Sequence, residues 1–327
     1  MSFINDMKHL VLSVLLLWTP LALGQAVDKI PAAMDRPALT SAKAEQATLL
    51  AVTRAGPRLV AAGERGIILT SDDNGASWQQ AKVPTSVNLI ALRFVDAKRG
   101  WAVGHMGIVL HSEDGGLTWR KQLDGVEAAR LAVFDVWMDA QGRGFITGAF
   151  NLMFRTDDGG EHWRYWSPRV KNPFGLHLYD ITAVGENFII AGEQGLLLRS
   201  DDGGEHFTPL ESPYEGTWFG ILATRAGSLI AYGLRGNAYV SHDGGDNWQA
   251  CETGSKASFS AATELADGRV VLANQAGQLF ASLDQGRSFQ PLKGLPGLPF
   301  ASLTQAESGE LILSGLRGLS RIEPIPL

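Results

Sequence analysis

The sequence predicts an all-β fold, a seven-bladed β-propeller with four-stranded blades, and three observations support this prediction. One octapeptide recurs six times at a nearly constant interval. Short apolar segments and glycine-bracketed turns recur in the same order around each copy. The composition, with 38 glycines and nine tryptophans in 327 residues, suits many tight turns and repeated packing sites. Four short strands in each repeat of roughly 40 residues are typical of a propeller blade.

The octapeptide has the pattern Ser/Thr-x-Asp-x-Gly-x-x-aromatic. Successive copies start 41, 44, 44, 41 and 41 residues apart, a regularity that chance does not produce. The six copies are SDDNGASW at 71–78, SEDGGLTW at 112–119, TDDGGEHW at 156–163, SDDGGEHF at 200–207, SHDGGDNW at 241–248 and SLDQGRSF at 282–289.

Each octapeptide is expected to form the hairpin between the third and fourth strands of its blade. The carboxylate accepts backbone N–H bonds across the turn, the glycine provides a positive φ, and the aromatic ring packs between neighbouring sheets. The aspartates with this structural role are Asp73, Asp114, Asp158, Asp202, Asp243 and Asp284. These strings lack the alternating ligands of a calcium loop, so no metal and no cofactor is predicted.

The flanking segments give the other strands. In the second unit, strands are expected at 89–95, 100–103 and 108–111, with the turn GHMG between the last two. The final unit has three such segments but no octapeptide. Residues 27–44 are expected to supply its fourth strand and so close the ring. The propeller therefore forms one domain, 27–327.

The N-terminus is predicted to be a signal peptide, residues 1–24, with cleavage possible after residue 26. Its apolar segment at 10–18 is short for a membrane span, although an uncleaved anchor is the alternative. Export places the protein in the periplasm, or in a lumenal or extracellular space. The lone Cys251 allows no internal disulfide. A net charge of -6 argues against nucleic-acid binding.

The stretch GWAVGHMGIVLHSEDGGLTW at 100–119 resembles the photosystem II stability and assembly factor family of Asp-box (BNR-repeat) seven-bladed β-propellers. The resemblance covers about 46–322. It implies a chaperone-like binder of membrane-complex subunits that uses a basic patch on one face. We therefore expect a non-catalytic, monomeric assembly factor for an envelope or membrane complex. Its partner would be a protein subunit or an acidic segment of one, and its own association with the membrane would be peripheral at most.

The turns between strands two and three, and the links between blades, should line one face around the channel. Variable residues on a repeated frame are the natural candidates for binding. Arginines bind carboxylates, and aromatic residues anchor interfaces. The predicted binding residues are Arg65, His105, Arg130, Arg169, Lys171, Tyr214, Trp218, Arg235 and Arg317.

Alignment of the first strands places Asp135 and Asp180 in one register near the channel, on adjacent blades. Close carboxylates in a channel perturb each other's pKa, as catalytic pairs do. The pair could act in catalysis, but we favour bonds to channel water or backbone.

Two other functions remain open. Asp-box propellers include sialidases, and the nearest match to their site is Tyr179 beside Asp180, with Glu193 and an arginine set of Arg65, Arg235 and Arg317. The N-terminal Arg-Ile-Pro motif of those enzymes is absent. The other possibility is a permanent accessory subunit of an envelope transporter.

Overall fold

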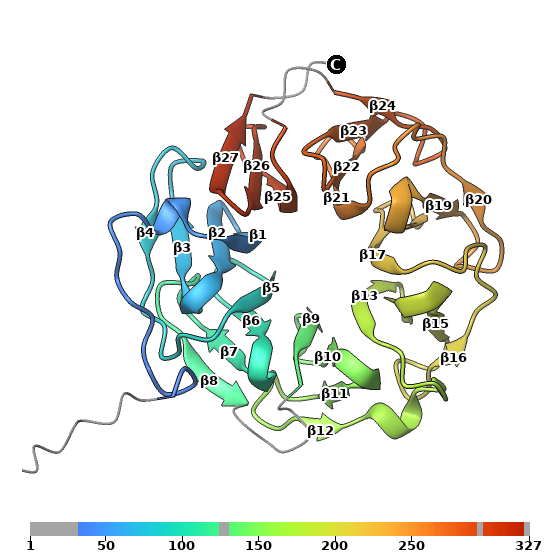
Figure 1. The fold of residues 1–327 in the computed structure, drawn as a ribbon. Coiled ribbons are helices and arrows are strands. Elements are labelled where there is room, and N and C mark those ends of the chain that lie inside the picture. Colours follow the sequence, from blue (N-terminus) through green and yellow to red (C-terminus); the bar gives the residue numbers. More distant parts are fainter. Residues whose placement is uncertain (1–31, 124–130, 293–296, 324–327) are drawn as a thin grey trace, which may run out of the picture. The chain divides into compact units, whose positions relative to one another are not determined.

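The computed structural model describes residues 32–123, 131–292 and 297–323, so the predicted signal peptide lies outside the described residues. Seven antiparallel sheets stand around a central channel, six with four strands and one with three (Figure 1). The predicted all-β, seven-bladed propeller is therefore confirmed. No helix in the described part of the chain is long and apolar enough to cross a bilayer.

Within each blade the strands follow one another from the channel outward in chain order (Figure 1). The first blade contains β1 (Leu49–Ala55), β2 (Arg58–Gly63), β3 (Ile68–Ser71) and β4 (Gln79–Gln80), and the second contains β5 (Leu89–Phe94), β6 (Gly100–Gly104), β7 (Val109–Ser112) and β8 (Arg120–Leu123). The third contains β9 (Val133–Met138), β10 (Gly144–Gly148), β11 (Met153–Thr156) and β12 (Arg164–Tyr165), and the fourth contains β13 (Leu178–Val184), β14 (Asn187–Gly192), β15 (Leu197–Ser200) and β16 (Thr208–Pro209). The fifth blade contains β17 (Trp218–Ala223), β18 (Leu229–Gly233), β19 (Ala238–Ser241) and β20 (Gln249–Ala250). The sixth contains β21 (Phe259–Glu264), β22 (Val270–Asn274), β23 (Leu279–Ser282) and β24 (Gln290–Pro291). The seventh contains β25 (Phe300–Gln305), β26 (Leu311–Gly315) and β27 (Gly318–Ile322).

The turn between the second and third strands is a short 3-10 turn in the first five blades. These turns are η2 (Glu64–Gly66), η3 (His105–Gly107), η5 (Ala149–Asn151), η7 (Glu193–Gly195) and η8 (Leu234–Gly236). The middle residue of each turn has a positive φ; these residues are Arg65, Met106, Phe150, Gln194 and Arg235.

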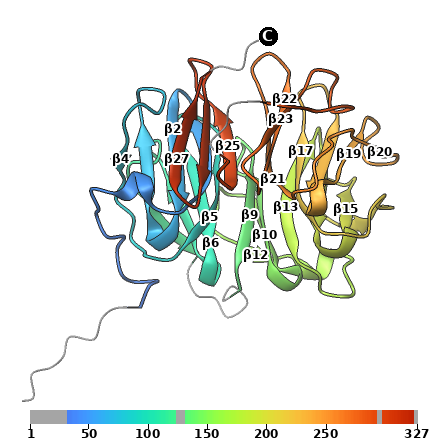
Figure 2. The same ribbon diagram turned by 45° about the horizontal axis from the view of Figure 1, so that its top comes forward.

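These turns share one face with the links between blades, because the turns bond to the links. Leu234 N, for example, donates to Thr217 O at 3.0 Å. We call this side the turn face and the side with the octapeptide hairpins the box face. Figure 1 looks onto the turn face, and the rotated view in Figure 2 carries the 3-10 turns to the lower rim.

The octapeptides brace their own hairpins. In the fourth copy, Asp202 Oδ1 accepts the backbone N–H of His206 at 3.0 Å, and Ser200 Oγ accepts that of Gly204 at 2.8 Å. Equivalent bonds recur in the other five copies. In the fifth copy, hydrogen bonds from the backbone and side chain of Asn247 lower the pKa of Asp243 to about 2. These carboxylates are therefore committed to local structure.

The core is divided into seven apolar clusters, one between each pair of neighbouring blades. Six of them include the aromatic residue of an octapeptide. Trp119, Phe207 and Phe289 are buried members, while Trp78, Trp163 and Trp248 are partly buried. The octapeptide thus shapes a hairpin and also fills the interface between two blades.

The predicted closure of the ring is wrong in one respect. Over residues 32–44, the described part of the segment expected to complete the last blade, no strand pairs with β27. Ala33 O instead accepts a bond from Ser86 N at 2.8 Å, which holds the segment on the link between the first and second blades. The following turn η1 (Ala44–Gln46) then lies against β27. The seam closes where β1 packs on β25, with Val52 N donating to Ser302 Oγ at 3.3 Å.

Candidate functional site: the channel mouth and the turn face

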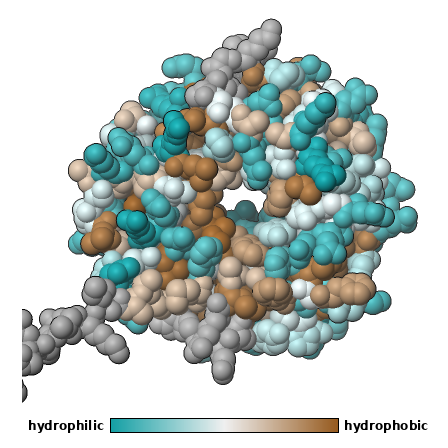
Figure 3. Space-filling model, viewed as in Figure 1, coloured by the Kyte–Doolittle hydropathy of each residue, from teal (hydrophilic) through white to brown (hydrophobic). Residues whose placement is uncertain are grey.

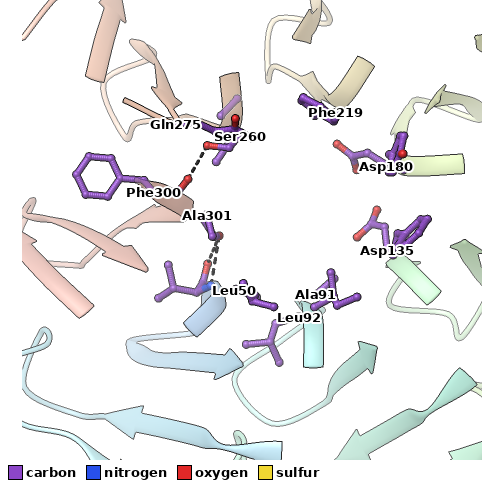
Figure 4. A pocket seen from close by; sticks show the side chains of 18 of the residues that line it. Leu50, Ala91, Leu92, Asp135, Asp180, Phe219, Ser260, Gln275, Phe300 and Ala301 are labelled. Atoms are coloured by element: carbon purple, nitrogen blue, oxygen red, sulfur yellow. Dashed lines mark hydrogen bonds between the residues drawn. The ribbon is translucent and has the colours of Figure 1, made fainter. Parts of the chain in front are cut away.

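A β-bulge near the start of the first strand of every blade turns one extra residue toward the channel. The bulge residues are Leu50, Ile90, Phe134, Tyr179, Phe219, Ser260 and Ala301. All seven line a cavity of about 730 Å³ (Figure 4). Gln275 and Leu316 from the turns also line it, so the cavity is the mouth of the channel on the turn face.

Asp135 and Asp180 lie at the floor of this cavity, with their carboxyl groups pointing toward each other (Figure 4). Asp135 Oδ2 accepts the backbone N–H of Ile181 at 3.1 Å, and Asp180 Oδ2 accepts that of Ile221 at 2.8 Å. Burial raises the pKa of both carboxyls, and the neighbouring Asp135 raises that of Asp180 further. The two carboxyls occupy the equivalent position of adjacent blades, opposite Thr147 and Ala191 of the neighbouring strands. Each carboxyl ties its blade to the next one.

Tyr232 takes the equivalent place in the fifth blade. Burial raises the pKa of its hydroxyl well above the usual range. The ring reaches the lumen because its strand partner is Gly220, where an added Cβ would lie 2.1 Å from the tyrosine oxygen. In the fifth blade, Gly220 stands in the register of Asp135 and Asp180, and a tyrosine on the next strand fills the place of the aspartate. That glycine is the sequence signal that could have revealed the role of Tyr232.

Arg93 is a channel residue that the sequence analysis did not single out. It lies two residues beyond the register position in β5 and lines a second cavity of about 190 Å³ together with Asp135 and Asp180. Its side chain is exposed in the channel, where desolvation by the surrounding blades lowers its pKa and attraction to the two carboxyls acts in the opposite direction. The charge of Arg93 therefore offsets that of the carboxyl pair.

The carboxyl pair gives a pH prediction. A carboxyl whose pKa is raised in the folded state stabilises that state only while protonated, so its contribution is complete below about pH 4 and is lost as the pH rises through the folded pKa. Asp180→Asn keeps an acceptor for Ile221 and a donor for Asp135. The decline of melting temperature between about pH 4 and pH 8 should therefore be shallower in this variant than in the wild type. The exposed Glu113→Gln variant should keep the wild-type slope, and an unchanged slope in Asp180→Asn would contradict a raised pKa of Asp180 in the folded state.

An aromatic arc runs along the third to fifth blades, and Phe134, Tyr179 and Phe219 in it line the mouth. Its members are Phe134, Phe150, His177, Tyr179 and Phe219. Phe134 and Tyr179 stack with ring centres 5.2 Å apart, and Tyr179 meets Phe219 edge-on at 5.9 Å. His177 Nδ1 accepts the backbone N–H of Phe150 at 2.9 Å, which fixes its ring against the turn. The arc is therefore built from both the bulges and the turns.

Four of the predicted binding residues lie exposed on the turn face, and these are Arg65, His105, Arg235 and Arg317. Within the described residues, none of the three arginines takes part in a side-chain ion pair. Arg130 lies outside the described residues.

Arg169 and Lys171 are not brought to the mouth. Their link pairs with the octapeptide of the fourth blade, where Lys171 N donates to Phe207 O at 2.9 Å. Arg169 packs over the Trp166 ring at 5.0 Å and lies 3.5 Å from the carboxylate of Glu205. The prediction that they join the arginines of the turns is therefore wrong, because this link runs along the outer side of the blades.

The prediction that Trp218 is an exposed anchor is also wrong. Its side chain is fully buried between the fourth and fifth blades, and its Nε1 donates to Ser212 Oγ at 3.2 Å. Tyr214 is half-buried against it, with ring centres 5.3 Å apart. The bulge is the physical cause, since it turns Phe219 toward the lumen and leaves Trp218 in the core.

Large apolar side chains are exposed on the same face as the three arginines. Phe150 is 66% exposed and Leu316 is 61% exposed, both at turn tips, and Phe174 in a link is 85% exposed. Figure 3 shows hydrophobic residues gathered beside the channel mouth. Exposed apolar residues and arginines on one face are typical of an interaction surface.

No group of three His, Cys, Asp or Glu side chains that could hold a metal ion occurs in residues 32–123, 131–292 and 297–323. The site therefore consists of an apolar cavity, a polar floor that is already hydrogen-bonded, and a basic rim.

Comparisons with known proteins agree with this geometry. The family model described as photosynthesis system II assembly factor YCF48 matches residues 70–133 and 125–293. The solved structure "YCF48 bound to D1 peptide" is 19% identical with a TM-score of 0.69, and the match covers 88% of this chain and 99% of that one. YCF48 from Cyanidioschyzon merolae is 13% identical with a TM-score of 0.69, over 85% and 96% of the two chains.

The fold itself is shared more widely. The WD40 propeller domain of Doa1 is 11% identical with a TM-score of 0.66, and the match covers 88% of this chain and 95% of that one. None of the curated proteins matches the chain. Because the family model matches well over half of its residues, the chain belongs to the family of the photosynthesis system II assembly factor YCF48.

Proposed function

We propose that this chain is an exported, non-catalytic assembly factor that binds a segment of a membrane-complex subunit on its turn face. Its family and the solved complex of a YCF48 with a D1 peptide support a protein partner. The observation that carries the choice of face is that Arg65, Arg235 and Arg317, which form no side-chain ion pair within the described residues, are exposed on the same face as large apolar side chains.

Other arginines of the chain are used internally. Arg155 lies 2.9 Å from Asp157 and 2.8 Å from Glu205, and Arg199 lies 2.9 Å from Asp201. An arginine without such a carboxylate keeps its full capacity for bidentate binding of one. The turn face is therefore suited to acidic groups of a partner, whereas Arg155 and Arg199 are already paired with carboxylates of their own chain.

The location and state of the protein are part of the proposal. The predicted signal peptide supports a periplasmic location, because its charged start, apolar segment and small residues near 24 and 26 are the features that export requires. The protein would act as a monomer, peripheral to the membrane at most, and would bind its partner transiently during assembly.

Cross-linking in cells tests the proposal. The tagged protein is cross-linked, purified and analysed by mass spectrometry beside an Arg65→Glu, Arg235→Glu, Arg317→Glu variant. We expect the wild-type protein to recover a membrane-complex subunit. The amount recovered with the variant should be lower by a factor of about ten or more, because reversed charges repel an acidic segment. The control carries the same charge change at exposed positions away from the turn face: Lys98→Glu, Arg164→Glu and Arg287→Glu.

Recovery that is equal in both variants would show that another surface binds the partner. If wild-type protein recovers no membrane-complex subunit, the assembly function itself is rejected. Hydrolysis of a glycan substrate that Tyr179→Phe abolishes would reject the non-catalytic assignment.

A further inference from the structure

We infer that the channel mouth holds an apolar side chain of the partner segment, and that acidic residues flank this side chain in the partner. The inference rests on the proposed function and specifies what the turn face recognises. It concerns the cavity walls, which the arginines on the rim do not form.

The walls are apolar. Leu50, Ile90, Phe134, Phe219 and Ala301 offer only carbon atoms, and Tyr179 presents its ring within the aromatic arc. The hydroxyl of Ser260, the remaining bulge residue, already donates to Phe300 O at 2.6 Å. A cavity of about 730 Å³ with such walls has the size and character of a preformed binding pocket.

The polar floor does not call for a charged ligand. Asp135, Asp180 and Ser302 each accept a backbone N–H of the next blade, and the charge of Arg93 offsets that of the carboxyl pair. A charged group entering the mouth would be desolvated and would have to compete for these bonds. An apolar side chain loses only water, so burial in the mouth is favourable.

The rim selects the neighbours of that side chain. Leu316 lines the mouth, and the next residue is the exposed Arg317. Arg235 and Arg65 occupy the turn tips of the fifth and first blades. A segment that lies across the turn face with its apolar residue in the mouth therefore meets exposed guanidinium groups on that face, with Arg317 next to the mouth, and these groups bind carboxylates.

Peptide binding to the purified full chain tests the inference. The probe is a fluorescein-labelled peptide, GSDEWEDSG in one-letter code, with matched probes carrying serine or lysine in place of the tryptophan. We expect the tryptophan probe to bind at least about tenfold more tightly than either matched probe, because a buried aromatic residue is a dominant interface anchor. Anisotropy measures the three affinities.

Two protein variants separate the mouth from the rest of the surface. Ala301→Trp fills the cavity without removing any group and should weaken binding of the tryptophan probe about tenfold. Leu283→Trp adds the same ring to the box face, at a residue that is 82% exposed, and should bind like the wild type. If Ala301→Trp does not fold, as judged by circular dichroism and melting temperature, Phe219→Ser provides the second test.

The inference that the mouth binds an apolar side chain would be overturned if the serine and tryptophan probes bound equally tightly, if the lysine probe bound most tightly, or if no probe bound. It would also be overturned if Ala301→Trp bound the tryptophan probe as tightly as the wild type does. Binding to vesicles of phosphatidylcholine and phosphatidylglycerol without any peptide binding would instead assign the face to lipid. Each of these results leaves the recovery of a membrane-complex subunit in cells intact, so failure of the anchor is distinguishable from failure of the assembly function.

Discussion

Replacing Trp218 with alanine should lower the free energy of unfolding by about 3–5 kcal/mol, the usual cost of deleting a large aromatic side chain from a core. Trp218 is fully buried and packs in the cluster between the fourth and fifth blades, with ring contacts to Tyr214 at 5.3 Å and Tyr239 at 5.7 Å. Its removal leaves a cavity and also leaves Ser212 Oγ without its indole donor. Urea unfolding followed by tryptophan fluorescence or circular dichroism measures the loss.

The matched control is Phe174→Ala. Phe174 is also a large aromatic residue, but it is 85% exposed, so its removal should change stability by less than about 0.5 kcal/mol. A Trp218→Ala variant with wild-type stability and weakened binding of the partner would show that Trp218 contacts the partner, as the sequence alone suggested.

The fold was predictable because its determinants are local and repeated. Six octapeptides report six hairpins, and the residues of each copy bond to one another within eight positions. The register of Asp135 and Asp180 was predictable for the same reason, since homologous strands align by their flanking turns. Repetition therefore conveys both the number of blades and the equivalent positions within them.

The site was only partly predictable, because its contacts depend on bulges and on chain paths that lack a local signal. The bulge exchanges Trp218 for Phe219 at the mouth, and a one-residue shift reverses which side chain faces the lumen. Arg169 could not be placed because its long link pairs with an octapeptide of the next blade. Closure of the ring failed as a prediction because a tertiary bond between Ala33 and Ser86 competes with strand pairing.

Gly236→Ala should destabilise the protein by at least about 3 kcal/mol, because the substitution combines backbone strain with a clash. Gly236 ends the turn η8 with φ +74°, and an added Cβ would lie 2.2 Å from Ser255 O in the link that enters the sixth blade. Thr253 Oγ1 also donates to Gly236 O at 3.2 Å, so turn and link have little freedom to separate. The variant should therefore loosen the turn face between the fifth and sixth blades.

Gly244→Ala isolates the strain from the clash. Gly244 has φ +75° in an octapeptide hairpin, but no heavy atom lies within 4 Å of the added Cβ, so only the left-handed backbone should matter, at about 1–2 kcal/mol. The difference between the two variants in urea unfolding measures how tightly the turn is held on the link. Equal losses would show that the link gives way, and the turn tips, Arg235 among them, would then be positioned by their own blades rather than by their neighbours.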